Sequence, residues 1–429
     1  MVENNKRIFA LVDCNNFYVS CERLFDPSVR GVPAVVLSNN DGCVIARSDE
    51  VKELGISMGT PYFEVEEQLG ELGTHVFSSN YPLYGDMSRR VMNRLEQFTP
   101  DVEVYSIDEA FLDLTKFYHR NLAEYGKEIA EDVRKSIGIP ISVGIGPTKT
   151  LAKIAMECVK RDKSHPVKNL LDPADWDDIL ETIDVDDIWG IGRQRSKTLL
   201  KHGIDNARKF RDADERWIRD EFTVMGHRTQ QELRGIPCFE FENEPPPKKN
   251  IASAKSFQKP VTSEEELREA LTHFAERGAE KLREQGSVAR GIQVFIRTSR
   301  FRGPSYRNAT HRTLDPPTQA SPVLAREVTQ ALKTIYRDGF RYKKAGIFLT
   351  ELRPARFAQR SLTSEESRSE KEEFMETVDE INEEFGSNTL HLASAGFKRD
   401  WQLCFDHHSP HYTTRWEDIP VAYTTISSA

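Results

Sequence analysis

The sequence predicts an α+β protein built of several domains, and three features of its 429 residues lead to this fold class. Residues 8–160 alternate between strand-like and helix-like patterns. Residues 166–240 show only helical patterns. Residues 251–355 alternate again, after the segment Glu-Pro-Pro-Pro-Lys-Lys-Asn at 244–250, in which consecutive prolines favour a stiff, extended linker. Because the length exceeds that of an ordinary domain, we expect about two to four domains.

The first alternating stretch starts with short apolar runs that are typical of buried strands. Asp41-Gly42 lies between two such runs and indicates a hairpin. The patterns predict strands at 8–12, 33–38, 43–46, 102–107, 110–114 and 140–145, and helices at 48–55, 83–98, 121–137 and 148–160. This alternation indicates a sheet with helices on one of its faces.

The later parts of the chain follow the same logic. Residues 166–240 are expected to be wholly helical, with glycine turns at 190–192 and 203. The second alternating stretch predicts strands at 251–257, 291–299, 309–314 and 345–352, and helices at 263–285 and 321–338. Residues 360–384 are rich in charge and are expected to be partly flexible and partly an exposed helix.

The net charge of −9 hides two regions of opposite sign. Residues 251–355 hold 19 Lys and Arg against 11 Asp and Glu, whereas residues 356–429 hold 7 against 14. A basic module fits a polyanionic partner such as nucleic acid, although solvated protein surfaces are also often basic. The sequence therefore predicts a basic module followed by an acidic tail.

Targeting and redox features indicate a cytoplasmic protein. No apolar run reaches the roughly 18–20 residues of a membrane span, and the N-terminus lacks a signal-peptide cleavage pattern. The six cysteines lie far apart without a Cys-x-x-Cys pair. This usage fits reduced thiols and argues against a zinc site.

Adjacent acids in an apolar stretch are the first chemical signal. Asp108 and Glu109 lie within Tyr-Ser-Ile-Asp-Glu-Ala-Phe-Leu-Asp, where burial of unpaired charge is costly. A third acid, Asp13, follows the predicted strand 8–12. Three carboxylates at two strand ends supply the hard oxygen ligands that Mg²⁺ prefers. The alternative for Asp108 and Glu109 alone is a salt-bridged turn or a helix start.

The predicted helix 148–160 suggests a second site. Thr148 can cap it, and Lys149 and Lys153 lie one turn apart on one face. Exposed amides at a helix start, together with lysines, would form an anion site suited to a triphosphate. The alternative is that these lysines simply face water.

Two more segments favour nucleotide and DNA contacts. Phe17 and Tyr18 follow Asp13 closely and can line a sugar-and-base pocket, although Phe17 could equally start a core helix. Trp189-Gly-Ile-Gly192 is similar to a helix-hairpin-helix turn, in which glycine amides approach a DNA phosphate without reading sequence. Three basic residues follow it, Arg193, Arg195 and Lys197. An ordinary tight helical turn is the alternative for this segment.

Together these segments resemble the Y family of lesion-bypass DNA polymerases, and within it the UmuC branch. The resemblance covers nearly the whole chain and its combined motifs are highly specific. The motifs are Asp13-x-Asn-x-Phe-Tyr18, Val36-Leu-Ser-Asn-Asn-Asp-Gly-Cys-Val-Ile-Ala-Arg47, Ser78-Ser-Asn-Tyr-x-Leu-Tyr84, Tyr105-Ser-Ile-Asp-Glu-Ala-Phe111, Thr148-Lys-Thr-Leu-Ala-Lys153, Val185-Asp-Asp-x-Trp-Gly-Ile-Gly192 and Tyr412-Thr-Thr-Arg415.

The resemblance implies a right-hand polymerase, an error-prone enzyme that copies damaged DNA in the bacterial SOS response. The implied domains are a palm of residues 1–17 and 82–165, small fingers of 18–81, a helical thumb of 166–240, a linker of 241–250, a little finger of 251–355 and an acidic C-terminal extension of 356–429. Small fingers enclose the templating base loosely, so damaged bases are tolerated.

The resemblance also implies roles for individual residues. Asp13, Asp108 and Glu109 match the catalytic acids that hold two Mg²⁺ ions, with the carbonyl of Cys14 as a further ligand. Tyr18 matches the steric gate that excludes a 2′-hydroxyl. The other implied nucleotide contacts are Phe17, Cys43, Ile45, Arg47, Lys52 and Lys153, and the implied DNA contacts are Gly190, Gly192, Arg193 and Lys255.

The implied partners are primer-template DNA, a deoxynucleoside triphosphate, a UmuD′-type dimer and a RecA-type recombinase filament. Two departures from the family pattern stand out. The candidate sliding-clamp peptide, Gln359-Arg-Ser-Leu362-Thr363, lacks its aromatic anchor, and such anchors commonly dominate interfaces. Asp49 stands where some members of the family have a tyrosine that contacts phosphate. Arg47 could make this phosphate contact instead.

Other functions fit the sequence less well. A stand-alone bypass polymerase of the DinB kind would lack the C-terminal extension. A non-catalytic DNA-binding factor would not need three intact acids, Tyr18 and Lys153. A nucleotide cyclase also uses palm-like acids, but it would not explain the glycine turn at 189–192 or the basic module.

Overall fold

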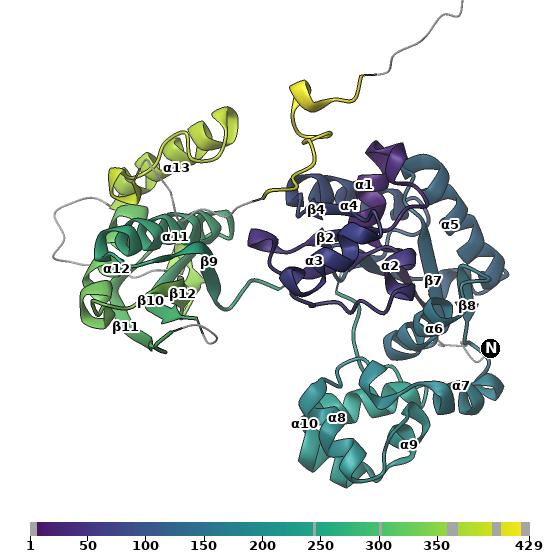
Figure 1. Cartoon of the computed structure of the whole chain (residues 1–429). Helices are drawn as coiled ribbons and strands as arrows, with labels where there is room; N and C mark the ends of the chain where they lie inside the picture. Colours follow the sequence, from purple (N-terminus) through teal and green to yellow (C-terminus); the bar gives the residue numbers. More distant parts are fainter. Residues whose placement is uncertain (1–6, 243–245, 300–302, 358–367, 397–404, 422–429) are drawn as a thin grey trace, which may run out of the picture. The chain divides into compact units, whose positions relative to one another are not determined.

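The computed structural model describes residues 7–242, 246–299, 303–357, 368–396 and 405–421. The chain divides into two compact units (Figure 1). The first comprises Met1–Pro245 with Asp406–Ala429, and the second comprises Pro246–Phe405. The last described segment of the chain therefore belongs to the same unit as its beginning. Both units combine helices and sheets, which confirms the α+β class.

A five-stranded sheet lies at the centre of the first unit. Its strand order is β5-β6-β1-β7-β8, and β1 pairs antiparallel with both β6 and β7. The strands are β1 (Phe9–Cys14), β5 (Val102–Val104), β6 (Glu109–Asp113), β7 (Ile141–Gly146) and β8 (Val167–Asn169). The first four confirm predicted strands. The fifth, β8, lies in the stretch expected to be wholly helical, so that expectation is wrong at its start.

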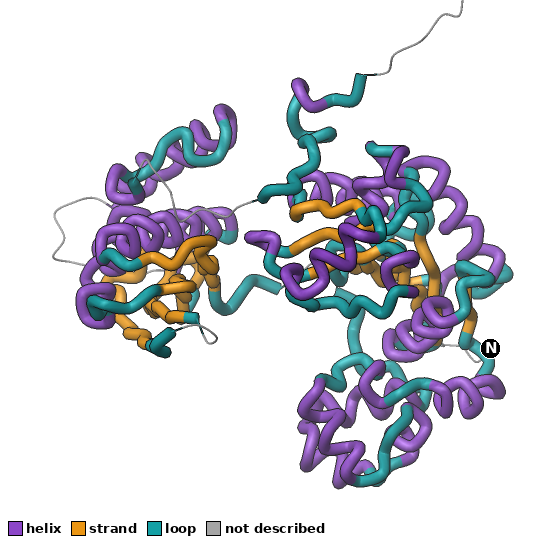
Figure 2. Tube along the Cα trace, viewed as in Figure 1, coloured by secondary structure: helices purple, strands orange, loops and turns teal. Residues whose placement is uncertain are grey.

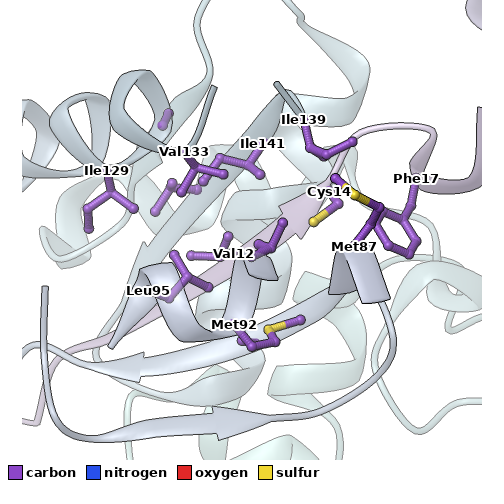
Figure 3. Close-up of a cluster of buried hydrophobic side chains, with 14 of the residues drawn as sticks. Val12, Cys14, Phe17, Met87, Met92, Leu95, Ile129, Val133, Ile139 and Ile141 are labelled. Carbon is purple, nitrogen blue, oxygen red and sulfur yellow. The ribbon is translucent and has the colours of Figure 1, made fainter. Parts of the chain in front are cut away.

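Helices cover both faces of this sheet, so the expectation of helices on one face only is wrong. Along β1, Ala10 and Val12 join the core beneath α1 (Phe17–Phe25), α4 (Tyr81–Leu95) and α5 (Leu122–Ile137). Figure 3 shows Val12 among side chains of these helices. Phe9 and Leu11 pack instead against α6 (Lys149–Arg161). Because successive strand residues face opposite sides, the fully buried β1 needs cover on both.

A smaller sheet of order β3-β2-β4 lies in the same unit. Its strands are β2 (Ala34–Leu37), β3 (Val44–Arg47) and β4 (His75–Ser78), with α2 (Asp49–Glu53) and α3 (Tyr62–Glu71) alongside. The predicted hairpin is confirmed, because β2 and β3 pair antiparallel across a turn at Asn39–Asp41. The parallel strand β4 and the helix α3 were not anticipated from the sequence.

Four helices follow the main sheet: α7 (Trp176–Thr182), α8 (Arg193–Lys201), α9 (Ala207–Asp212) and α10 (Glu215–Leu233). They share a core around Leu180, Phe210 and Ile218. Leu151 and Ile154 of α6 belong to the same core. The helix α6 therefore packs on the main sheet with one side and on this helical segment with the other.

The second unit contains a five-stranded sheet with two helices on one face (Figure 2). Four strands follow the order β11-β10-β12-β9, and the fifth, β13 (Arg353–Pro354), pairs with β10. The elements are β9 (Ile251–Val261), α11 (Glu264–Glu284), β10 (Ser287–Thr298), β11 (Arg307–Thr318), α12 (Ser321–Ile335) and β12 (Tyr342–Thr350). Ile292, Val294 and Ile296 are buried beneath the helices, which confirms the predicted alternation. A further helix, α13 (Arg368–Phe385), confirms part of the predicted charged helix.

Residues 406–421 return to the first unit and pack beside α1 and α4. The amide of Ser78 donates a 2.9 Å hydrogen bond to the carbonyl of His407. The ring of Tyr412 stacks on that of Phe25, with centroids 4.9 Å apart. Deeper in, Ser409 reaches Glu22, a carboxyl group that is only 1% exposed. This segment, whose described part ends at residue 421, is called the strap below.

Glu22 makes the stability of the first unit depend on pH. Burial raises the pKa of Glu22 to about 7, although hydrogen bonds from Tyr84 and Ser409 lower it. Its Oε2 has no hydrogen-bond partner among the described residues. Other titratable groups act on it or feel its charge: Cys21, Asp26, Tyr84 and Tyr412. A carboxyl group whose pKa is raised in the folded state stabilises the fold fully at pH values below its ordinary pKa of 4.5. This stabilisation is lost as the pH rises through 7.

We therefore expect the free energy of unfolding of the wild type to fall between pH 4.5 and pH 8. The fall should exceed that of Glu22→Gln by about 3 kcal/mol, because each pKa unit corresponds to about 1.4 kcal/mol. Urea unfolding at several pH values measures this difference. Parallel stability curves for the two proteins would show that Glu22 does not titrate in this range.

Candidate active site

The strand pairing brings the three predicted acids together. Asp13, near the end of β1, lies directly opposite Glu109, the first residue of β6. Directly opposed residues of an antiparallel pair point to the same face of the sheet. Asp108 immediately precedes β6, and its carbonyl accepts a 2.9 Å hydrogen bond from the amide of Cys14. The expectation that the acid pair sits where a strand ends is confirmed.

Ser106 fixes the turn that carries Asp108. Its hydroxyl donates a 2.6 Å hydrogen bond to Oδ1 of Asp108. The hydroxyl oxygen of Ser106 also accepts hydrogen bonds from the amides of Asp108 and Glu109, at 3.3 and 3.0 Å. A short polar side chain that bonds the backbone two and three residues ahead is typical of tight turns. Ser106 therefore holds the carboxylate of Asp108 in a defined direction.

Lysines of α6 face the acids. Lys153 Nζ lies 3.0 Å from Glu109, and Lys160 Nζ lies 2.6 Å from Asp13. Burial raises the pKa of Asp13 to about 6, Lys160 lowers it, and the charges of Glu109 and Asp108 raise it. Lys160 was not singled out from the sequence. Its spacing of seven residues from Lys153, two helical turns, is the signal that could have found it.

The donor set fits a divalent cation, although the site is not preassembled. Within the described ranges, no group of three or more His, Cys, Asp and Glu side chains lies close enough together to hold a metal ion. Lysine ammonium groups engage Asp13 and Glu109 instead. The three carboxylates offer hard oxygen ligands, and the charges of Glu109 and Asp108 help to raise the pKa of Asp13. A thiolate ligand does not fit, because Cys14 is buried and its thiol pKa is raised by burial.

Tyr18 lies close to the acids. Its ring stacks on that of Tyr84 at 4.4 Å, and the edge of Tyr81 lies 6.3 Å away. Burial raises the pKa of Tyr18 to about 12, with further contributions from Tyr81 and the charge of Asp108. Phe17, in contrast, is 4% exposed and belongs to the core. This burial favours the alternative, a residue that starts a core helix, and a contact of Phe17 with a nucleotide stays a prediction.

The small sheet contributes a second group of predicted contacts. Lys52 Nζ donates to Asn16 Oδ1 at 2.6 Å and lies 3.1 Å from Asp49. Lys163 also pairs with Asp49, at 2.7 Å. Burial alone would raise the pKa of Asp49, but hydrogen bonds from Lys163, Asn16 and Lys52 lower it to about 2. Asp49 therefore links the end of α6 to the small sheet.

The remaining predicted residues of the small sheet lie just before and along β3. Cys43 is half-buried, and its amide donates to the hydroxyl of Ser38. Ile45 is half-buried and packs against the same core as Tyr18. Arg47 donates to the carbonyl of Ile56. No contact with a nucleotide follows from these bonds, and the three assignments stay predictions.

The helix start and Lys149 do not form the expected anion site, whereas the role of Lys153 stays a prediction. Thr148 caps the helix as predicted, accepting from the amide of Leu151. The amide of Thr150, however, donates at 2.8 Å to the carboxylate of Glu232 on α10. Lys149 is 2% exposed and pairs with Glu103 at 2.5 Å. Carboxylates of the protein thus satisfy the positive end of the helix and its first lysine.

The glycines before α6 serve close packing. A Cβ atom on Gly144 would lie 2.4 Å from the carbonyl oxygen of Ala152, and one on Gly146 would lie 2.7 Å from the amide nitrogen of the same residue. Only glycine lets the backbones of β7 and α6 approach so closely. The Gly-x-Gly pattern therefore allows close packing of the helix on the strand here.

The glycine turn at 189–192 adopts a defined conformation. Gly190 has φ +84°, a left-handed value, and Arg195 donates a 2.9 Å hydrogen bond to its carbonyl. Gly192 precedes α8, which begins at the exposed Arg193. The element before the turn is a short 3₁₀-helix, Val185–Asp187. Trp189 donates to the hydroxyl of Tyr105 at 2.9 Å, a contact with the main sheet that the sequence did not indicate.

Lys255 lies in the second unit, exposed on β9. The candidate clamp peptide at 359–363 lies outside the described residues. In the part of the chain that the structure describes, no helix is long and apolar enough to cross a membrane.

Comparisons with known proteins agree with this geometry. The model of the impB/mucB/samB family matches residues 12–157 and that of its C-terminal domain residues 248–362, while a domain of unknown function matches residues 372–422. The chain is 43% identical to the protein UmuC of Salmonella typhimurium, over 96% of this chain and 99% of that protein. It is 41% identical to the protein ImpB of Salmonella typhimurium, over 97% and 99%.

More distant matches share the fold. DNA polymerase IV 1 of Bacillus subtilis is 28% identical over 69% of this chain and 71% of its own length. A solved chimeric Y-family DNA polymerase is similar in structure, with a TM-score of 0.65 and 21% identity over 80% of this chain and 98% of its own.

The fold, with its three acids at one end of β1 and β6, is that of a Y-family DNA polymerase, a DNA-directed nucleotidyltransferase. More narrowly, the chain belongs to the impB/mucB/samB family of error-prone translesion polymerases, as its motifs predicted.

Proposed function

We propose that this chain extends a primer across damaged template bases with Asp13, Asp108 and Glu109 as its catalytic acids. The observation that carries the proposal is the direct pairing of Asp13 with Glu109, with Asp108 held beside them by Ser106. These carboxylates would hold two Mg²⁺ ions, with the carbonyl of Cys14 as a further ligand. Such ions supply an activated primer 3′-hydroxyl and charge stabilisation of the leaving pyrophosphate.

The lysines of α6 prepare the site for an anionic substrate. Lys153 and Lys160 neutralise Glu109 and Asp13 in the free protein. Cations held by these carboxylates would neutralise them in place of the lysines, and Lys153 and Lys160 would then be available to hold the triphosphate. Lys52, which donates to Asn16, would add a third cation. Positioning and charge neutralisation supply most of the acceleration in phosphoryl transfer.

Tyr18 would exclude ribonucleotides. Its ring is held by Tyr84 and Tyr81, close enough to Asp108 to feel that charge. A bulky ring fixed beside the sugar leaves no room for a 2′-hydroxyl, so discrimination is steric. Cys43 and Ile45 would face the nascent base pair, and Arg47 would contact phosphate.

The proposed domains bind DNA through its backbone. The main sheet would be the palm, the small sheet the fingers, residues 166–240 the thumb and the second unit the little finger. Gly190, Gly192 and Arg193 would contact phosphates through the thumb turn. Lys255 and the other basic residues of the little finger would do the same, making affinity strongly dependent on salt.

The proposed partners follow the UmuC-like branch. The matches to UmuC and ImpB span nearly the full chain, whereas the match to DNA polymerase IV 1 covers 69% of it. The full-length likeness favours an enzyme that works with a UmuD′-type dimer and a RecA-type filament in the bacterial cytoplasm over a stand-alone DinB-like polymerase. The sliding clamp would be a weak partner, because residues 359–363 lack the aromatic anchor.

Primer extension on undamaged DNA tests this function. With Mg²⁺ and deoxynucleotides, we expect template-directed extension of a labelled primer, and stronger extension when a UmuD′-type dimer and a RecA-type filament are added. Full activity without either partner would favour the DinB-like alternative. No extension under any of these conditions, by a protein that is folded and binds primer-template, would contradict catalysis.

A further inference from the structure

The strap docks on the first unit through a built set of polar contacts. The Nδ2 group of Asn80 donates to the carbonyl of Pro410 at 3.1 Å and to the hydroxyl of Ser409 at 2.9 Å. At the same place the amide of His407 donates to the hydroxyl of Ser78 at 3.0 Å. Asn80 is also the N-cap of α4. The strap is therefore bound where α4 begins, the helix that carries Tyr81 and Tyr84.

A buried relay leads inward from the strap. The hydroxyl of Ser409 donates to Glu22 Oε1 at 3.1 Å, and the hydroxyl of Tyr84 donates to the same oxygen at 2.6 Å. Ser409, Glu22 and Tyr84 are 5%, 1% and 0% exposed. Buried polar networks are stable only when their members stay bonded. The phenol of Tyr84 is thus fixed by a carboxyl group that the strap itself helps to hold.

The ring of Tyr84 in turn fixes Tyr18. The two rings stack with centroids 4.4 Å apart and planes 15° apart. Tyr81 meets the edges of both, each at 6.3 Å. The hydrogen bond to Glu22 fixes the hydroxyl end of the ring that stacks on Tyr18. The four side chains from Ser409 to Tyr18 therefore form one continuous chain of contacts from the surface segment to the nucleotide site.

We propose that the strap is a positioning element for sugar selection: Ser409, acting through Glu22 and Tyr84, holds the ring of Tyr18 in its gating position. The proposal rests on the proposed function, because it assumes that Tyr18 is the gate. It assigns a role to the last part of residues 372–422, the region matched by a domain of unknown function. Ser409, Glu22 and Tyr84 are positioning residues that do not touch the substrate.

The test compares sugar discrimination in matched variants of the full-length protein. Tyr84→Phe removes the phenol oxygen and keeps the stacked ring. Ser409→Ala removes the strap hydroxyl. Thr414→Ala is the control, because it removes a hydroxyl from the same segment at an exposed position. For each variant, kcat/KM is measured with a deoxynucleotide and with the matching ribonucleotide, and folding is checked by urea unfolding.

We expect Ser409→Ala and Tyr84→Phe to raise ribonucleotide use relative to deoxynucleotide use by about fivefold, the effect of losing one buried hydrogen bond. Thr414→Ala is expected to keep the wild-type ratio. Tyr18→Ala serves as the reference and should raise the ratio further than either positioning variant.

Two results would overturn the proposal. One is a wild-type ratio of ribonucleotide to deoxynucleotide use in both Ser409→Ala and Tyr84→Phe, while Tyr18→Ala changes that ratio. Tyr18 would then still be the gate, and the strap would have no part in positioning it. The other is an equal loss of activity with both sugars, which indicates only a structural role. A wild-type ratio in Tyr18→Ala would instead contradict the gate role in the proposed function, and the strap's role would fall with it.

Discussion

Primer extension by Asp108→Ala is expected to be at least about a thousandfold slower than by the wild type. The substitution removes one of three carboxylates at the end of β1 and β6. Cation-mediated charge stabilisation is worth several kcal/mol in the transition state, and each 1.4 kcal/mol or so is a factor of ten in rate. Single-turnover extension of a labelled primer measures the loss.

Asp113, at the other end of β6, is the matched control. Its carboxylate accepts from the amide of Thr115 and lies away from the other acids. Asp113→Ala should keep most of the wild-type extension rate, and both variants should bind primer-template at similar concentrations. An Asp108→Ala variant that extends primers within a few-fold of the wild-type rate would exclude Asp108 from catalysis.

Gly144→Ala is expected to destabilise the first unit by about 3 kcal/mol or more, which is the upper range for overpacking a well-packed core. The new Cβ would lie 2.4 Å from the carbonyl oxygen of Ala152 and 2.5 Å from the amide nitrogen of Met156. Both atoms belong to the backbone of α6, so neither can rotate away. The strand β7 and the helix α6 must separate, which disturbs the helix that carries Lys153 and Lys160.

Gly85 provides the matched control for this substitution. It lies within α4, and a Cβ atom there would meet nothing within 4 Å. Because alanine favours a helix interior over glycine by about 1 kcal/mol, Gly85→Ala should be neutral or slightly stabilising. Urea unfolding compares the two variants. Equal stability of Gly144→Ala and the wild type would contradict the packing explanation.

The sequence predicted the positions of the acids because their evidence is local. Asp108 and Glu109 are adjacent, and Asp13 follows a clear apolar strand, so strand patterns alone place them at strand ends. The place of Tyr18 near Asp108 agrees with its position soon after Asp13. The presence of most strands in both units could also be predicted, because residue type follows the alternation of burial, as at Ile292, Val294 and Ile296. Their boundaries were less accurate, as at β10, which was predicted at 291–299 and spans Ser287–Thr298.

The errors arose where one local pattern has two physical causes. A Gly-x-Gly segment before a lysine-bearing helix fits both a phosphate site and close backbone packing. Only the neighbours in space decide between them: Glu232, 82 residues away, satisfies the amide of Thr150. Phe17 posed the same problem, since an aromatic residue at a helix start suits either a pocket or a core.

The strap was beyond sequence reasoning for a similar reason. Ser409 and Glu22 are separated by 387 residues, and neither belongs to a pattern that predicts contact. The acidic composition of residues 356–429 suggested one solvated extension, whereas the chain returns to the first unit at residue 406. Long-range polar pairs of this kind become visible only in the fold.

Extension past an abasic site tests the central claim most directly. The wild type, with Mg²⁺, deoxynucleotides, a UmuD′-type dimer and a RecA-type filament, would be compared with Asp108→Ala on the same damaged template. We predict that the wild type inserts a nucleotide opposite the abasic site and extends beyond it, whereas Asp108→Ala stops at the preceding base. The same template without the abasic site is the control, and the wild type should copy it. If the wild type copies this control but both proteins stop before the abasic site, lesion bypass by this site is contradicted.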